Sequence, residues 1–260
     1  MKLWVVTATT NAFRSASCLA SWGDVKIHVI GNGPEVGTPY LGTVPAFRWG
    51  VDHVLEETDA DIIACLHDDF EIHEPNWATR VIRHFERHPQ CGLLGFGGAI
   101  GLGDTDIYQK PYAPVQLARI GFRSNLDDAE VHGMRSILPE PVACLDGFSQ
   151  IGRRTFWEGY LAGSAIGHVD KHPRPWTVLE QLGIVHHFYD GALGCLARRY
   201  GWETWYLPVR AKHLGGQTAV GDAGYQEWAK TQTEGGDHGF WEAAHQKSYE
   251  AFRDVLPIRV

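Results

Sequence analysis

The chain is poor in cysteine and methionine, and it lacks a long apolar run. Five of its 260 residues are cysteine and two are methionine. Because the cysteines are widely spaced and form no Cys-x-x-Cys pair, we expect reduced thiols and neither a disulfide nor a zinc framework. No apolar run approaches the roughly 18 residues that span a bilayer, and the apolar part of the N-terminus is too short for a signal peptide. We therefore expect a cytoplasmic protein without a transmembrane segment.

Positive charge is also scarce. The chain has 23 lysines and arginines against 31 acidic residues, a formal net charge of -8. This balance argues against a globally basic surface that binds nucleic acid. Aromatic residues, in contrast, are plentiful, with 10 Trp, 9 Tyr and 11 Phe. Together with a hydrophobic content of 44% they are sufficient for a substantial core.

Apolar strands and amphipathic helices alternate in the first hundred residues. Short connections and nearly continuous apolar strands predict an α/β fold, with a mixed, mostly parallel sheet flanked by helices in a single domain. The Gly-rich segment 92–103 is expected to be a strand followed by a flexible loop. The expected strands are 3–9, 25–30 and 62–66, and the expected helices are 12–22, 44–57 and 77–88.

The second half of the chain has weaker patterns. Residues 104–140 are polar and irregular, which predicts an insertion that contacts a substrate. A helix is expected to begin at Asp190 and to end before Gly201. The expected elements after it are a strand at 202–208 and helices at 225–231 and 240–255.

The candidate site starts from His67-Asp68-Asp69, which follows the apolar run 62–66 directly. Adjacent carboxylates repel each other and are costly to desolvate, so a divalent metal beside them is the expected reason for the pair. Ligands of parallel sheets bind beyond the carboxyl ends of the strands, where these residues fall. Alternation places His67 and Asp69 on one face and Asp68 on the other. The competing interpretation is that one carboxylate caps a turn and the other is solvated.

Three further positions can carry chemistry. His213 follows a strand; an imidazole beside a carboxylate suits Mn²⁺ better than Mg²⁺, although a lone loop histidine is often merely exposed. Asp190 stands where a helix N-cap belongs, and an ionised carboxylate there can also act as a base. The residues before it would supply walls or hydrogen bonds: His186, His187, Phe188 and Tyr189. Asp146, which precedes Gly147, either holds substrate hydroxyls or makes a plain turn.

Taken in order, these segments resemble the GT-A glycosyltransferases, specifically the inverting family 2 group. Leu66-His67-Asp68-Asp69 is similar to the Asp-x-Asp motif of that family, with His67 in place of the first acid. The segment 188–193 resembles its Asp-x-Asp-Leu stretch, with Ala192 in place of the second acid, and 209–216 resembles its closing Val-x-x-x-His-x-Gly-Gly. The likeness also includes the ends of the first two strands and a helix that matches the family's Ala-x-Asn-x-Gly, with Arg48 in place of the Asn.

The resemblance implies a GT-A (Rossmann-like) fold and transfer of a sugar from a nucleoside diphosphate donor to an acceptor hydroxyl, with inversion. Residues 1–103 would form the nucleotide-binding half, 104–220 the acceptor and catalytic half, and 221–260 a C-terminal helical segment. Asp69 and His213 would hold Mn²⁺ or Mg²⁺, and Asp190 would be the base. The implied donor-binding residues are Thr7, Thr9, Asn32, Arg48, His67 and Asp68, and the acceptor-binding residues are Asp146, Gly147 and His187.

The acceptor stays open among a glycan, a small molecule and a modified DNA base, and two other functions stay open. One is a metal-dependent hydrolase, which needs histidines that converge on two metals. Its residues would be His67, Asp68, Asp69, His186, His187 and His213. The other is a non-catalytic nucleotide-sugar-binding module, which the missing acid at Ala192 supports.

Overall fold

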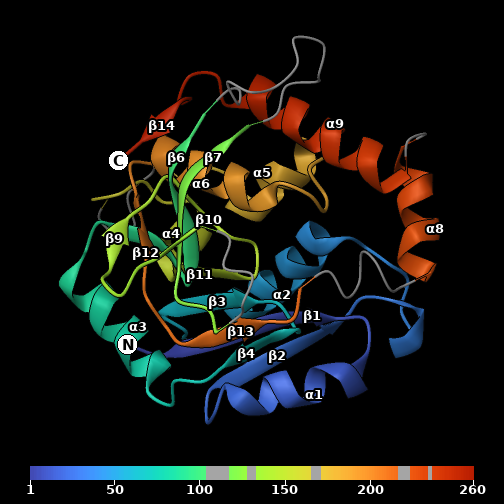
Figure 1. Ribbon diagram of the computed structural model, residues 1–260, viewed down its shortest axis with the longest axis horizontal. Helices are drawn as coiled ribbons and strands as arrows, with labels where there is room; N and C mark the ends of the chain where they lie inside the picture. The colour runs from blue at the N-terminus through green and yellow to red at the C-terminus, as the bar shows by residue number, and fades with distance from the viewer. Residues whose placement is uncertain (104–116, 128–132, 165–170, 216–222, 234–235) are drawn as a thin grey trace.

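Seven strands form the central sheet of the protein. The structure, a computed structural model, describes residues 1–103, 117–127, 133–164, 171–215, 223–233 and 236–260. The strand order in the sheet is β2-β1-β3-β11-β5-β12-β9 (Figure 1). Strand β1 (Leu3–Thr9) pairs in parallel with both β2 (Lys26–Gly31) and β3 (Ile62–Leu66). On the other side of the sheet, β5 (Cys91–Gly95) pairs in parallel with β12 (Glu203–Tyr206).

Two strands of this sheet run against the others. Strand β11 (Ser149–Arg153) lies between β3 and β5 and is antiparallel to both. The short edge strand β9 (Glu140–Pro141) is antiparallel to β12. The expected α/β class with a mixed, mostly parallel sheet between helices is confirmed.

Helices cover both faces of the sheet, and the pleat of β1 shows how. Val5 packs in a cluster with Trp22, at the end of α1 (Ala12–Ser21), and with Trp77 of α3 (Trp77–Arg87). Val6 points to the other face and packs in a cluster with Phe47 of α2 (Thr43–Glu57). Helices α5 (Pro175–Gln181) and α6 (Tyr189–Arg199) contribute to that second cluster. The alternation of a strand buried on both faces produces this two-sided core.

A second sheet lies beside the first, and its strands contradict two expectations from the sequence. Strand β6 (Gly97–Leu102) pairs with β7 (Arg119–Ser124), so the Gly-rich segment 92–103 forms two strands and not a strand and a loop. Its glycines permit close packing, since a Cβ at Gly97 would lie 2.7 Å from the Phe148 ring. The insertion 104–140 is not wholly irregular either, although its residues 104–116 and 128–132 lie outside the described part. The sheet also contains β10 (Cys144–Leu145), β8 (Met134–Arg135) and β14 (Ile258–Arg259).

A two-stranded ribbon brings a distant segment to the end of β3. Strand β4 (Phe70–Ile72) pairs antiparallel with β13 (Ala211–His213), and His213 lies opposite Phe70. The backbone N–H of Leu214 donates to the carbonyl oxygen of Asp69 at 2.9 Å. This pairing places His213 beside Asp69 although 143 residues of sequence separate them.

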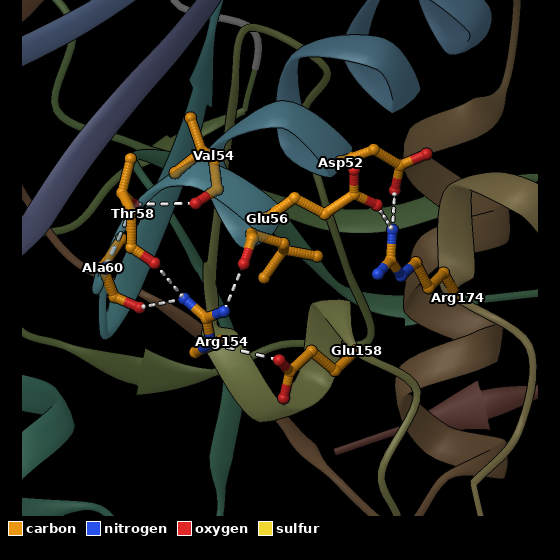
Figure 2. Close-up of polar contacts among 9 residues, drawn as sticks. Asp52, Val54, Glu56, Thr58, Ala60, Arg154, Glu158 and Arg174 are labelled. Carbon is orange, nitrogen blue, oxygen red and sulfur yellow. Dashed lines mark hydrogen bonds and ion pairs between the residues drawn. The ribbon is translucent and has the colours of Figure 1, made fainter.

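The C-terminal end of α2, which precedes β3, is fixed by an arginine of the short helix α4 (Arg154–Trp157) (Figure 2). The Arg154 guanidinium donates to the carbonyl oxygens of Thr58 and Ala60, at 3.1 and 3.2 Å, and to that of Leu55. Glu158 binds the same guanidinium. A cation here satisfies carbonyls that a helix end leaves without intrahelical partners, and it opposes the negative end of the helix dipole.

Helices α8 (Ala223–Gln232) and α9 (Gly236–Ala251) pack against each other and against the rest of the chain. Phe240 and His245 of α9 are buried. A three-residue 3-10 turn, Pro34–Val36, follows β2. Among the described residues, none of the helices has the length and apolar character needed to cross a membrane.

Candidate active site

Three potential metal ligands converge just beyond the carboxyl end of β3. His67, Asp69 and His213 each offer one ligand atom, and these atoms lie within 4.8 Å of one another. Asp69 Oδ1 lies 3.3 Å from His213 Nε2 and 3.9 Å from His67 Nδ1. His67 and Asp69 lie in the turn between β3 and β4, outside both strands, so strand alternation does not apply there, and Asp68 lines the same cavity as its two neighbours. The β4–β13 ribbon supplies His213.

A tyrosine hydroxyl determines which nitrogen of His67 faces this cluster. Tyr189 Oη donates to the carbonyl oxygen of Gly147 at 2.9 Å, and that oxygen can only accept. The hydroxyl has one proton, so it accepts from His67 Nε2–H at 2.6 Å. The hydrogen-bond network thus assigns the proton to Nε2 and leaves a lone pair on Nδ1, the atom nearest Asp69. This is the arrangement by which an outer hydrogen bond fixes a metal-binding tautomer.

Burial and neighbouring charges together favour the metal-binding forms of His67 and Asp69. Burial lowers the pKa of His67 below its ordinary value, which keeps the imidazole neutral at pH 7, although Asp69 opposes the shift. Burial alone would raise the pKa of the Asp69 carboxyl, but His213 and His67 hold it below its ordinary value. A neutral His67 imidazole and an ionised Asp69 carboxylate are therefore available at neutral pH.

A second group of charged side chains lies at the N-terminal end of α6. Asp190 is buried, and its Oδ2 accepts from Arg119 Nη2 at 2.5 Å. Nη1 of the same guanidinium lies 3.4 Å from Asp146 Oδ2. Burial opposes the charge on Arg119, but the two carboxylates raise its pKa above the ordinary value. Arg119 therefore holds two acids together that would otherwise repel each other.

Asp190 is not the N-cap that the sequence predicted. Helix α6 begins at Tyr189, so Asp190 lies within the first turn, and Phe188 is the N-cap. Phe188 has φ 57°, the left-handed conformation that bulky residues rarely adopt. Its ring packs on His245 of α9, with centroids 4.0 Å apart. Asp190 Oδ1 accepts from the backbone N–H of Gly191, so the carboxylate is fixed from two sides.

Gly147 contributes space and a carbonyl rather than a side chain. A Cβ at this position would lie 2.6 Å from Tyr189 Oη and 3.5 Å from Asp190 Oδ2. A side chain would therefore displace the hydroxyl that binds His67. The sequence grouped Gly147 with Asp146 as acceptor-binding residues, and the structure puts both on the wall of the cavity that contains Asp190.

Two cavities meet at the cluster. The smaller, about 180 Å³, contains the three ligands together with Asn32 and Asp68, and the larger, about 560 Å³, contains Asp190 and Arg119. Their walls share Thr43, His67 and His186. The metal-ligand cluster thus lines the smaller cavity, and His67 connects it to the larger one.

Three predicted donor-binding residues lie away from the smaller cavity. Thr7 and Thr9 are buried in β1, whereas Ala8 and Thr10 line the wall. Arg48 forms ion pairs with Glu180 at 2.6 Å and Asp52 at 3.5 Å. Asn32 and Asp68 do reach the wall, and Asn32 Oδ1 also accepts from the backbone N–H of Leu41. A role in donor binding stays a prediction for all of these residues.

The other two histidines of the hydrolase alternative have partners outside the cluster. His186 Nδ1 lies 2.8 Å from Thr43 Oγ1. His187 Nε2 lies 2.7 Å from Asp237 Oδ1, at the start of α9. Within the described part of the chain, His67, Asp69 and His213 form the one grouping of this kind. The arrangement favours a single metal over a pair.

Sequence reasoning missed Arg119, and it named Tyr189 only among the residues beside Asp190 that supply walls or hydrogen bonds. Arg119 falls in the stretch that had no periodic pattern, so no sequence signal connected it with Asp190. Tyr189 was visible only as the neighbour of Asp190. Its function depends on β3, β11 and α6 meeting in space, which no local pattern reveals.

No protein-family model matches the sequence, and no curated protein matches it. Among solved structures, A197 from STIV is similar over 82% of this chain and 86% of its own, with 12% identity and a TM-score of 0.46. GalNAc-T7, solved with UDP, GalNAc and Mn²⁺, is similar over 82% of this chain and 44% of its own, with 10% identity and a TM-score of 0.45. CMP:2-keto-3-deoxy-manno-octonic acid synthetase, complexed with CTP, is similar over 81% of this chain and 90% of its own, with 11% identity and a TM-score of 0.37. These likenesses concern the fold alone.

Proposed function

We propose that the protein is a metal-dependent, inverting glycosyltransferase that moves a sugar from a nucleoside diphosphate donor to an acceptor hydroxyl. One observation carries this proposal. His67, Asp69 and His213 converge in one cavity, His67 also lines a second cavity, and this second cavity contains a buried, fixed carboxylate, Asp190. A metal site and a base in adjoining compartments fit the transfer of a group between two bound molecules.

The residues fit a divalent metal. Asp69 Oδ1 is buried and has no hydrogen-bond partner of good geometry among the described residues. Two imidazole nitrogens and a carboxylate suit Mn²⁺ better than Mg²⁺, which prefers oxygen ligands. When bound, such a metal neutralises the negative charge that develops on a departing diphosphate. The smaller cavity, with Asn32 and Asp68, is the proposed place for the nucleotide.

Asp190 is the proposed base. Each carboxylate oxygen has two lone pairs, so Oδ1 and Oδ2 can each accept another proton donor beside Gly191 and Arg119. An acceptor hydroxyl in the larger cavity would give its proton to Asp190 as its oxygen attacks the sugar. Asp146, Gly147 and His187 line the same cavity and are the proposed contacts of the acceptor.

Nucleotide binding tests the metal site without any acceptor. With Mn²⁺ and a series of nucleoside diphosphates and their sugars, we expect one nucleotide to raise the melting temperature, because a ligand of the folded state stabilises it. Asp69→Ala should abolish the metal-dependent part of that rise. Asp24→Ala removes an exposed carboxylate and is the matched control. A normal metal-dependent shift in Asp69→Ala would disprove the site.

Asp190→Asn tests the base. The amide keeps the shape but cannot take a proton, so we expect normal donor binding and a transfer rate lowered by roughly 10²–10⁴-fold. The measurement is sugar transfer in single turnovers with the donor identified above. Undiminished transfer would rule out Asp190 and direct attention to Asp146. Donor hydrolysis without any acceptor would favour the hydrolase, and tight binding without turnover against any acceptor would favour the binding module.

A further inference from the structure

One side of helix α3 concentrates positive charge in an otherwise acidic protein. Arg80, Arg83, His84 and Arg87 recur at intervals of three and four residues, so they lie on one face of the helix, and His88 follows at its C-cap. These five residues line a cavity of about 290 Å³ whose wall is completed by Pro139 and Leu207. None of its lining residues belongs to the two cavities of the candidate active site.

Most of this charge is not neutralised by neighbours. Arg80 forms an ion pair with Glu74 at 2.5 Å. Arg83 and Arg87 are exposed, and within the described ranges no acidic side chain forms an ion pair with either. Two guanidinium groups therefore face the cavity region with their charge unbalanced.

A buried histidine gives a second, independent indication of a ligand. His84 is 6% exposed, and its Nε2 atom is buried without a hydrogen-bond partner among the residues that the structure describes. Burial, with the nearby His88 and Arg153, lowers its pKa to about 4, so the ring is neutral at pH 7. The ring stacks on His88, with centroids 4.3 Å apart, which fixes its position in the wall. Polar atoms buried without a partner are costly and rare, and a bound group can satisfy them.

We propose that this cavity is a second binding site and that it takes a phosphate monoester group. A phosphate monoester carries close to two negative charges at neutral pH, which match the two unbalanced guanidinium groups. Arginine binds such oxyanions through paired N–H donors, and a neutral imidazole supplies a further donor or accepts from a protonated oxygen. The volume is at the lower end of the range for small-molecule sites.

The phosphate can belong to a soluble molecule or to a lipid headgroup, and the surroundings make both worth testing. The residues just before Pro139 expose large apolar side chains: Ile137 is 75% exposed and Leu138 is 69% exposed. Apolar side chains beside arginines are typical of surfaces that rest on anionic membranes. The chemistry that the cavity recognises is the same in the two cases.

Calorimetric titration with inorganic phosphate tests the site, in EDTA and at low salt. We expect the double variant Arg83→Gln/Arg87→Gln to bind phosphate at least about tenfold more weakly than the unaltered protein. The double variant Arg253→Gln/Arg259→Gln removes the same charge from exposed arginines elsewhere and should bind normally. Asp69→Ala should also bind normally, which separates this site from the proposed metal centre. Equal losses in the two arginine variants would overturn the proposal.

Sedimentation with vesicles identifies the source of the phosphate. The vesicles are phosphatidylcholine alone or with phosphatidic acid, whose headgroup is a phosphate monoester. Binding that requires phosphatidic acid and is lost in Ile137→Ser/Leu138→Ser supports a lipid ligand. Binding of inorganic phosphate without vesicle binding supports a soluble ligand. If neither phosphate nor phosphatidic acid binds, the site does not exist as proposed.

Discussion

At the scale of single residues, the hydroxyl of Tyr189 orients one ligand of the candidate metal centre, His67. It joins His67, just after β3, to the Gly147 carbonyl before β11 through two hydrogen bonds. Burial raises the pKa of this phenol well above its ordinary value, so the hydroxyl keeps its proton and its role as a donor to Gly147. The orientation of His67 therefore does not depend on the metal being present.

Tyr189→Phe tests this role. Without the hydroxyl, His67 is free to rotate and to change tautomer, so we expect affinity for Mn²⁺ to fall about 10- to 100-fold. Metal titration followed by calorimetry measures the change. Tyr200→Phe removes a hydroxyl that binds the Pro173 carbonyl and serves as the control. Unchanged metal affinity in Tyr189→Phe would show that the tyrosine is structural only.

Residue types near the strand ends could be predicted because they depend on local pattern. Asp69 comes shortly after the apolar strand β3, His213 is the last residue of β13, and the structure brings both to one point. Arg119 could not be predicted, since it is one of two arginines in a strand with no alternation of burial. The role of Arg119 follows from its ion pairs with Asp146, which comes just after β10, and with Asp190 of α6.

At the scale of elements, the first half of the fold followed from the sequence better than the second. The strand Leu3–Thr9 and the strand Ile62–Leu66 have the predicted bounds, because each is a continuous buried run between clear breaks. Strand β11 was missed, although it occupies the centre of the sheet. It follows both of its partners by more than 50 residues and inserts antiparallel between β3 and β5, so its pairing is non-local and leaves no local signal.

The end of α2 depends on one side chain, which gives a prediction about stability. Arg154→Met keeps length and apolar contact but removes the donors to the carbonyl oxygens of Thr58 and Ala60 (Figure 2). We expect the free energy of unfolding to fall by about 2–3 kcal/mol, since hydrogen bonds to charged groups are worth more than neutral ones. Urea unfolding measures it. Arg253→Met, at an exposed position, should change stability little, and an equal effect of both variants would contradict this role of Arg154.

At the scale of the whole molecule, buried histidines make stability depend on pH. Burial lowers the pKa of His84 to about 4 and that of His245 to about 3. His245 Nδ1 also accepts from the backbone N–H of Leu117, a bond that protonation would break. In the unfolded chain these rings gain protons near pH 6.5, whereas in the folded protein they do not. The unfolded state thus binds more protons, and stability falls as pH drops from about 6.5 toward 4.

His245→Gln should reduce this pH dependence. Below about pH 6 each such histidine contributes a slope approaching 1.4 kcal/mol per pH unit to the free energy of unfolding. We expect urea unfolding between pH 7 and 5 to show a smaller slope for His245→Gln than for the unaltered protein. His238→Gln changes an exposed histidine of the same helix and should leave the slope unchanged. Identical slopes in all three proteins would contradict a neutral buried His245.

Strand β14 and the strand that carries Arg119, β7, both pair with β6. Ile258 of β14 and Arg119 of β7 lie opposite the same residue, Leu102 of β6, from its two sides. The backbone N–H of Val260 adds a hydrogen bond to Ile100 of that strand. Removal of β14 would therefore act on the strand ladder that holds Arg119 between Asp146 and Asp190, and so on the larger cavity of the candidate active site.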